Sequence, residues 1–236
     1  MNKRLIFVLV LTLAVSKGFA QDLLKSKEEI VLNLNSSDKN VRELKQAFPI
    51  YRNGIEDMFV TLHCCVRESY LNPPDKVQIW KNVNGYNATD NEKKYQLIYE
   101  FNAEGEGLDY IENVAEFTFK EDKFIKIEKV YYGSGHQTDI KIIHITSSGE
   151  LKDVMIESAT DHYLGLLGAG EFIGKGEIRD FKDNSMLFSF LIYNKGDANC
   201  CPTGGSVTGQ YKLVKTRIDN EEIFKLTVDT IHRNKE

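Results

Sequence analysis

The chain has 236 residues, of which 42% are hydrophobic, and its 30 Lys and Arg residues against 35 Asp and Glu residues give a formal net charge of -5 at pH 7. This length is enough for one large β domain or two small ones, each with a real core. The acidic balance disfavours nucleic acid as a partner, because the phosphate backbone attracts basic surfaces.

Residues 1–20 have the pattern of a secretory signal peptide. Lys3 and Arg4 precede an apolar run over residues 5–15, and small residues near position 20 suit signal peptidase. The run is too short for a bilayer core of about 30 Å, so a membrane anchor is the less favoured alternative. Cleavage is expected before Gln21, and a Gln at that position argues against a lipid-anchored lipoprotein.

The mature protein is expected to be periplasmic or secreted, without a stable membrane span. Removal of Lys3, Arg4 and Lys17 moves the formal charge from -5 to -8. The longest other apolar stretch, residues 186–193, is typical of a buried strand rather than a membrane helix.

The segment 21–50 is expected to be helical. Asn40 is placed to cap a helix, Glu43 lies three residues later as in a capping box, and Pro49 would end the helix. Apolar residues over 41–48 form a stripe between these signals. An earlier set falls near one face at 3.6 residues per turn: Leu23, Leu24, Ile30, Val31 and Leu34.

Residues 51–236 are predicted to form an antiparallel β domain. Alternation with period two dominates from Met58 onward, and turn signals at 72–74, 103–107, 147–149 and 219–220 follow at hairpin intervals. The clearest apolar stripes are Tyr95, Leu97, Tyr99 and Phe101; Ala115, Phe117 and Phe119; and Phe224, Leu226 and Val228. The predicted class is mainly β (α+β), with antiparallel sheets in a sandwich or open-barrel-like arrangement and short N-terminal helices.

An internal repeat with an offset of 62 residues is suggested by two similar segments. Residues 119–122 (Phe-Lys-Glu-Asp) and 181–184 (Phe-Lys-Asp-Asn) are followed at equal distances by Val130-Tyr131 and Ile192-Tyr193. Each copy is predicted to be a tight polar turn between two strands. Duplication of a sheet unit and convergence of two hairpins are both compatible with the pattern.

The four cysteines occur as two adjacent pairs, Cys64-Cys65 and Cys200-Cys201. The first pair ends a predicted strand, where neighbouring side chains point to opposite faces, and the second precedes Pro202 in a turn. Export favours structural disulfides, with at least one bond between the two pairs. A metal site that includes His63 and a redox-active vicinal disulfide are the alternatives, although neither ligand spacing nor a C-x-x-C motif favours them.

Residues 196–205 read Gly-Asp-Ala-Asn-Cys-Cys-Pro-Thr-Gly-Gly and precede a predicted strand over 207–218. This segment resembles the Cys-Cys-Pro-Ser/Thr-Gly turn of bacterial envelope proteins of the LppP/LprE lipoprotein type. The resemblance implies an exported β-rich module without an assigned reaction. The lipidation cysteine of those lipoproteins is lacking here, so membrane anchoring does not carry over.

No catalytic residue, metal ligand or cofactor is assigned from the sequence. His136 follows a Gly-Ser-Gly turn that does not fit G-x-S-x-G, and Asp161 and His162 form a second possible polar site. His144 lies in an alternating strand, where a hydrogen-bonded face residue is the simplest reading.

The expected function is a non-catalytic exported module of the bacterial cell envelope that binds a glycan, peptide or envelope partner through a sheet face or turns. This reading is favoured because no acid, base and nucleophile can be assembled. The alternative is an envelope hydrolase with dispersed active-site residues. Convergence of Asp161, His162 or His136 in a deep cleft would favour the enzyme.

Overall fold

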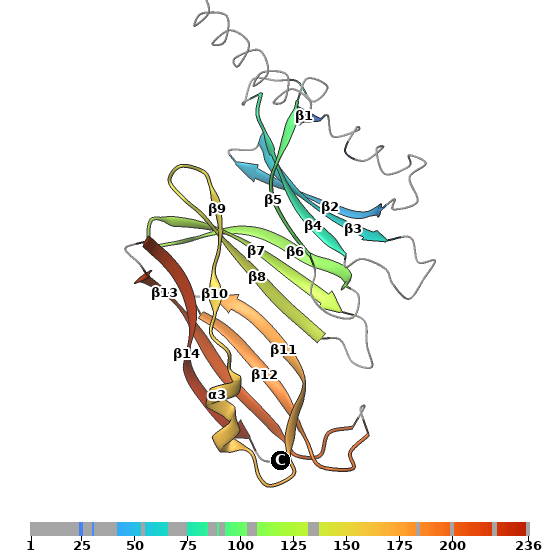
Figure 1. The fold of residues 1–236 in the computed structure, drawn as a ribbon, viewed down its shortest axis with the longest axis vertical. Helices are drawn as coiled ribbons and strands as arrows, with labels where there is room; N and C mark the ends of the chain where they lie inside the picture. Colours follow the sequence, from blue (N-terminus) through green and yellow to red (C-terminus); the bar gives the residue numbers. More distant parts are fainter. Residues whose placement is uncertain are drawn as a thin grey trace, which may run out of the picture. The chain divides into compact units, whose positions relative to one another are not determined.

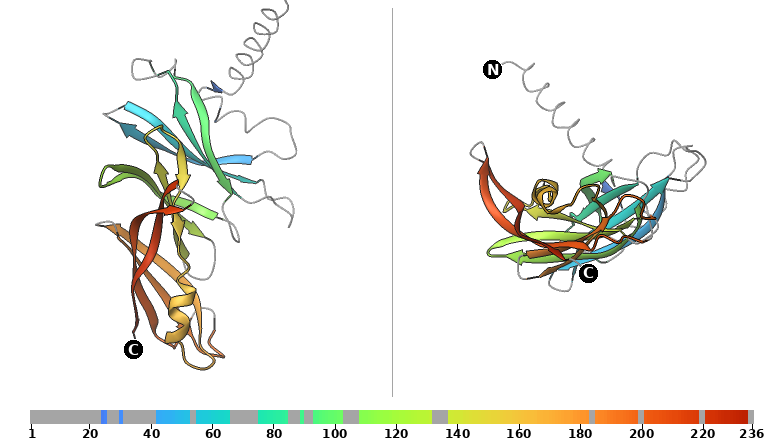
Figure 2. Two further views of the ribbon diagram at one scale, coloured as in Figure 1. Left: turned by 60° about the vertical axis from the view of Figure 1, so that its left-hand side comes forward. Right: turned by 90° about the horizontal axis from the view of Figure 1, so that it is seen from below.

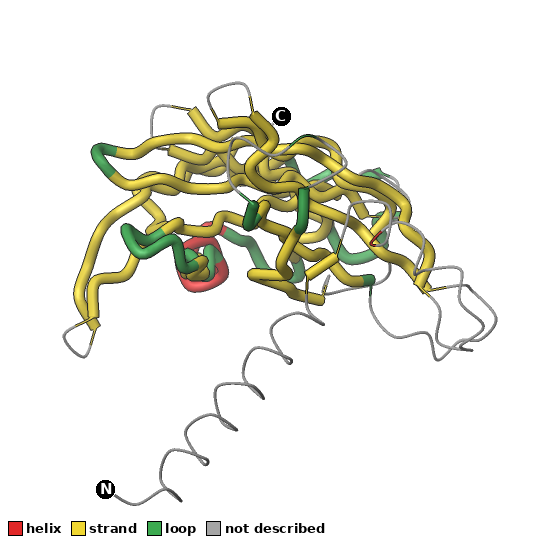
Figure 3. Tube along the Cα trace, turned by 90° about the horizontal axis from the view of Figure 1, so that it is seen from above, coloured by secondary structure: helices red, strands yellow, loops and turns green. Residues whose placement is uncertain are grey.

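The computed structural model describes residues 24–25, 30, 42–52, 55–65, 75–84, 89, 93–102, 108–131, 137–182, 185–198, 201–218 and 221–234. The chain divides into two compact units, residues 1–103 and 104–236, so the boundary falls inside the range assigned above to one β domain. Strands make up most of the described residues (Figures 1 and 3). The expectation of mainly antiparallel β structure is confirmed.

The first unit contains one five-stranded sheet in the order β1-β5-β4-β3-β2, with all neighbours antiparallel. Phe59 in β3 packs edge-on against Tyr95 at 4.7 Å between ring centroids and stacks with Trp80 at 6.3 Å. The strands are β1 (Leu24–Lys25), β2 (Arg42–Arg52), β3 (Ile55–Cys65), β4 (Lys76–Asn82) and β5 (Tyr95–Asn102).

The helix expected over residues 41–48 is wrong, because residues 42–48 belong to edge strand β2. Leu44 and Phe48 are four residues apart. Residues at this spacing lie on one face of a helix and also on one face of a strand. Pro49 is tolerated on this edge strand, where a missing N–H costs least. The first predicted helix meets the described residues in β1, a strand, and at Ile30; its other residues and the leader over 1–20 lie outside them.

The second unit contains one nine-stranded sheet in the order β10-β14-β13-β12-β11-β8-β7-β6, with β9 paired to β8. Its strands are β6 (Leu108–Phe119), β7 (Asp122–Tyr131), β8 (Gln137–Ile145), β9 (Leu151–Asp153), β10 (Met155–Ile156), β11 (Phe172–Lys182), β12 (Ser185–Tyr193), β13 (Ser206–Ile218) and β14 (Glu221–Asn234). Two pairings are parallel, β10 with β14 and β11 with β8, the latter at Glu177↔Thr138. Helix α3 (Thr160–Tyr163) and the 3-10 turn η3 (Leu164–Leu166) follow β10.

The second sheet curls, so that strands far apart in the sheet order meet through their concave faces (Figure 2). Phe224 in β14 packs edge-on against Phe124 in β7 at 4.8 Å and against Phe119 in β6 at 6.4 Å. Ala159, next to α3, belongs to the same core, and Tyr163 packs against it. This apolar interior fixes which side of each strand points outward.

The first copy of the repeat lies at a tight hairpin turn of the second unit, and the second copy lies where β11 ends and β12 begins, with residues 183–184 outside the described residues. Phe119 pairs with Asp122 at the first turn, whereas Lys182 pairs with Ser185 at the second. The second turn therefore closes one residue later than the sequence alignment implies. Whether the two hairpins arose by duplication stays a hypothesis.

Candidate functional site

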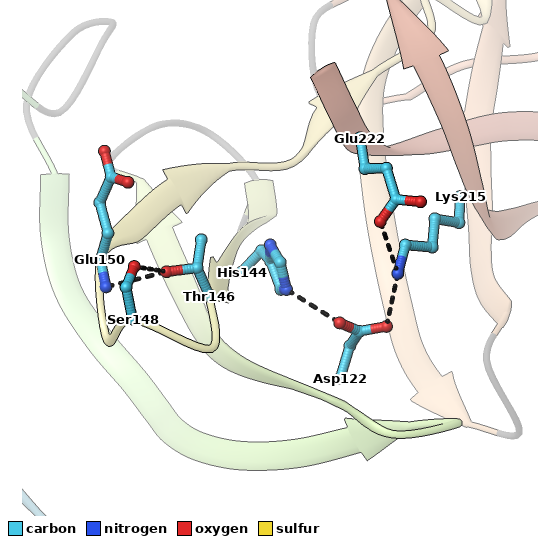
Figure 4. Close-up of polar contacts among 7 residues, drawn as sticks. All are labelled: Asp122, His144, Thr146, Ser148, Glu150, Lys215 and Glu222. Carbon is cyan, nitrogen blue, oxygen red and sulfur yellow. Dashed lines mark hydrogen bonds and ion pairs between the residues drawn. The ribbon is translucent and has the colours of Figure 1, made fainter. Parts of the chain in front are cut away.

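A charged cluster joins non-neighbouring strands of the curled sheet (Figure 4). His144 in β8 and Lys215 in β13 both contact the carboxylate of Asp122 in β7, His144 Nε2 at 3.3 Å and Lys215 Nζ at 3.4 Å. Lys215 Nζ also lies 3.2 Å from Glu222 Oε2 in β14. Because three strands separate β7 from β13 in the sheet, the cluster acts as a polar closure of the curl.

The surroundings of His144 favour its neutral form. Its ring lies 4.6 Å from that of Phe224 and 5.1 Å from that of Phe124, and burial lowers the pKa of His144 although Asp122 opposes the shift. An ionised carboxylate only accepts hydrogen bonds, so Nε2 carries the proton in the neutral ring. The hydrogen bond between Lys215 and Glu222 raises the pKa of the lysine and lowers the pKa of the glutamate.

A neutral histidine held by a carboxylate is half of a general-base arrangement, which also needs a nucleophile within reach. Among the described residues, Asp122 is the one polar side chain that hydrogen-bonds His144. The hydroxyls of the next turn are engaged elsewhere: Thr146 Oγ1 and Ser148 Oγ lie 2.8 Å apart, and Thr146 Oγ1 accepts a bond from Glu150 N (Figure 4). Within the described ranges, the cluster therefore links strands of the sheet, and no hydroxyl there bonds to His144.

Acidification from pH 7 to pH 5 is expected to destabilise the protein through His144. The pKa of His144 is lower in the folded chain than the ordinary value near 6.5, so the unfolded chain binds the proton first as the pH falls. This contribution to stability is present above about pH 6.5 and is lost as the pH falls toward the folded-state pKa. Urea unfolding at pH 7 and pH 5 measures the loss, which His144→Gln should reduce. Equal losses in the wild type and His144→Gln would contradict the assignment.

The convex side of β12, β13 and β14 carries nine side chains in three rows, which we call the outer polar face. The rows follow the strand register and alternate with core residues such as Phe188 and Tyr211. They are Leu191, Ser206 and Asn234; Ser189, Thr208 and His232; and Leu187, Gln210 and Thr230. None of the nine is buried.

The outer polar face presents hydrogen-bonding groups without Lys, Arg, Asp or Glu. Asn234 Nδ2 donates to Thr208 Oγ1 at 2.9 Å and to Ser206 Oγ at 3.4 Å, which orders one corner of the face. Strand dimensions give it a length of about 14 Å and a width of about 10 Å between the outer strands. Leu187 and Leu191 add exposed apolar surface at its edge.

The described cysteines lie in both units. Cys64 and Cys65 end β3, opposite Glu43 and Arg42 of β2, and Cys201 lies in the turn between β12 and β13. Cys200 lies outside the described residues. The pairing of the four cysteines therefore stays a prediction.

That turn between β12 and β13 is organised by Asp197. Its carboxylate accepts bonds from Asn194 N at 2.7 Å, Thr203 N at 2.9 Å and Thr203 Oγ1 at 2.8 Å. These donors, led by the Asn194 amide, lower the pKa of Asp197. Among the described residues of this turn, hydrogen bonds to Asp197 therefore hold Asn194 and Thr203 together.

The possible polar site of the sequence is only partly described. Asp161 and His162 are exposed on α3, and His162 Nε2 lies 3.6 Å from Glu157 Oε1. His136 lies outside the described residues, so its convergence with this pair stays a hypothesis. Glu157 also accepts a bond from Val228 N at 2.9 Å, which gives it a structural role at the edge of β14.

His63 is buried in the first unit, 2.7 Å from Thr61 Oγ1, which also accepts a bond from Trp80 Nε1 at 3.2 Å. Within the described ranges, no group of three or more His, Cys, Asp or Glu residues is placed to hold a metal ion.

Neither the Asp122–His144 pair nor the outer polar face was predicted from the sequence. The residues of the Asp122–His144 pair are far apart in sequence and form no local motif. The outer polar face did leave a signal, since Ser206, Thr208 and Gln210 alternate with apolar residues as a polar strand side does.

No protein-family model, curated protein or solved structure matches the chain. None of the helices in the described part of the chain is long and apolar enough to cross a membrane.

Proposed function

We propose that this protein is an exported, non-catalytic module of the bacterial cell envelope that binds a neutral glycan through the outer polar face. The absence of charge from this face carries the proposal. Charged residues make up 28% of the chain, yet the nine paired outward positions contain none; the exposed Asp229 lies next to Thr230 at the β-bulge of β14, on the border of the face. Hydroxyl and amide groups both donate and accept hydrogen bonds, which matches the hydroxyl groups of a sugar.

Export is supported by the leader pattern over residues 1–20 and by the resemblance of residues 196–205 to envelope lipoproteins. A neutral ligand also suits the acidic balance of the chain, since a polyanion would be repelled.

A hydrolase is the second candidate, and the Asp122–His144 pair favours it. A working active site would require that pair to act on a bound water, because no described hydroxyl bonds to His144. If the protein cleaved the polysaccharides tested below and His144→Gln abolished cleavage, the enzyme reading would replace the binding module.

Affinity electrophoresis of the mature protein in gels with laminarin, xylan, starch or dextran tests the binding proposal. At least one polysaccharide is expected to retard the wild type. The triple variant Thr208→Val, Gln210→Met and Thr230→Val keeps side-chain volume but removes hydrogen-bonding groups, and it should bind more than about tenfold more weakly.

Thr216→Val is the matched control, because it makes the same change at an exposed position of β13 away from the face. It is expected to bind like the wild type. Unretarded migration of the wild type in all four gels, or equal retardation of the triple variant, would refute the proposed face.

A further inference from the structure

The convex side of the sheet continues from the outer polar face onto an exposed aromatic ring of β11. Phe172 is 51% exposed and lies directly opposite Tyr193 of β12, with their rings stacked at 5.5 Å and 19°. Tyr193 is two residues beyond Leu191, so the two side chains leave the same side of the strand. Phe172 therefore adjoins the row that contains Leu191, Ser206 and Asn234.

The ring of Phe172 packs on a fixed neighbour, the ring of Tyr193. Gly174 lies beneath the ring of Tyr193, since a Cβ at that position would come within 2.2 Å of Tyr193 Cε2. Tyr193 is itself buried, so it is held between the backbone at Gly174 and the ring of Phe172. Phe172 thus rests on a fixed partner, while half of its surface stays available for a ligand.

We infer that Phe172 is a stacking subsite for one pyranose ring of the glycan, an inference that rests on the proposed function. A sugar ring has an apolar C–H face and a polar rim of hydroxyls. Phe172 and Leu191 offer apolar surface to such a face. Ser206 on β13 and Asn234 on β14, two and three strands from β11, offer hydrogen bonds to the hydroxyls of the next sugar units of the same glycan. The Phe172 subsite therefore lies at the end of the binding site next to the turn between β12 and β13, and it is expected to hold one sugar ring of the glycan.

Phe172→Ala tests this subsite in the same polysaccharide gels. The variant is expected to bind the retarding polysaccharide about tenfold more weakly, because the ring contact is lost. Tyr51→Ala removes a comparably exposed aromatic ring from the first unit and should bind like the wild type. Urea unfolding of both variants verifies that each is folded at the temperature of the assay.

Phe172→Trp supplies an independent readout, since the natural Trp80 is buried. The new indole should keep binding, and its fluorescence should change when the retarding polysaccharide is added. Wild-type affinity of Phe172→Ala or unchanged fluorescence of Phe172→Trp would overturn the subsite. If the subsite failed in this way but the Thr208, Gln210 and Thr230 variant still bound more weakly, the proposed function would stand. Failure of the subsite can therefore be told apart from failure of the proposed function.

Discussion

Replacement of Phe224 by alanine is expected to lower the free energy of unfolding by about 3–5 kcal/mol. Phe224 is buried where the concave faces of distant strands meet, against Phe124 and Phe119, and Lys215 Nζ lies 5.4 Å from its ring centroid. Its loss removes apolar burial and leaves a cavity between strands that no backbone hydrogen bond joins directly. Urea unfolding followed by intrinsic fluorescence and circular dichroism measures the change.

Leu187→Ala is the matched control for Phe224→Ala, because Leu187 is 51% exposed on the convex side. Its cost should stay below about 1 kcal/mol, the scale of a strand-propensity change. A cost of Phe224→Ala equal to that of Leu187→Ala would show that the curl does not depend on this ring.

Replacement of Arg233 by alanine is expected to lower the free energy of unfolding by more than the loss of an exposed ion pair does. The guanidinium of Arg233 makes two bonds to the carboxylate of Glu171, at 2.6 and 2.7 Å, and donates to the carbonyls of Leu166 and Gly204 at 2.9 and 3.2 Å. Both charged side chains are largely buried, at 17% and 14% exposure. The variant leaves the Glu171 carboxylate without this cation and releases three segments from one another.

Arg217→Ala is the control for Arg233→Ala. Arg217 also faces a carboxylate, that of Glu222 at 3.4 Å, but its side chain is 72% exposed. Exposed pairs are worth about 0–1 kcal/mol, so this variant should change little. A double-mutant cycle of Arg233→Ala with Glu171→Ala isolates the pair, and a coupling near zero would contradict the expected result.

The sequence predicts which segments form strands better than it predicts how those strands pair. Alternation along residues 115–119 and 224–228 marks both segments as strands, since the apolar spacing reflects burial of one side. The contact between Phe119 and Phe224 depends on the curl of the whole sheet, which no local sequence pattern predicts. The fold class therefore follows from the sequence, whereas the order of strands in the sheets does not.

The error over residues 42–52 has a different origin. A capping pattern at Asn40 and Glu43 and a proline at position 49 are local signals, whereas the pairing of β2 with β3 is a tertiary one. Leu44 and Phe48 fit both periods, so the local signals decided the prediction. The same limitation hid the Asp122–His144 pair, which forms only when β7 and β8 align.

The parallel contact of β11 with β8 divides the nine-stranded sheet into two halves. One half is the antiparallel set β6–β9, and the other is the antiparallel set β11–β14 with β10 added in parallel to β14. Among the described residues, these halves meet in the backbone at Glu177↔Thr138, whereas the hairpins within each half pair along most of their length. Side chains inside the curl must therefore supply most of the coupling between the halves. A ligand on the outer polar face would contact only the half that contains β12–β14. Any stabilisation of β6–β8 by that ligand would therefore be transmitted by the packed aromatic side chains rather than by hydrogen bonds between strands.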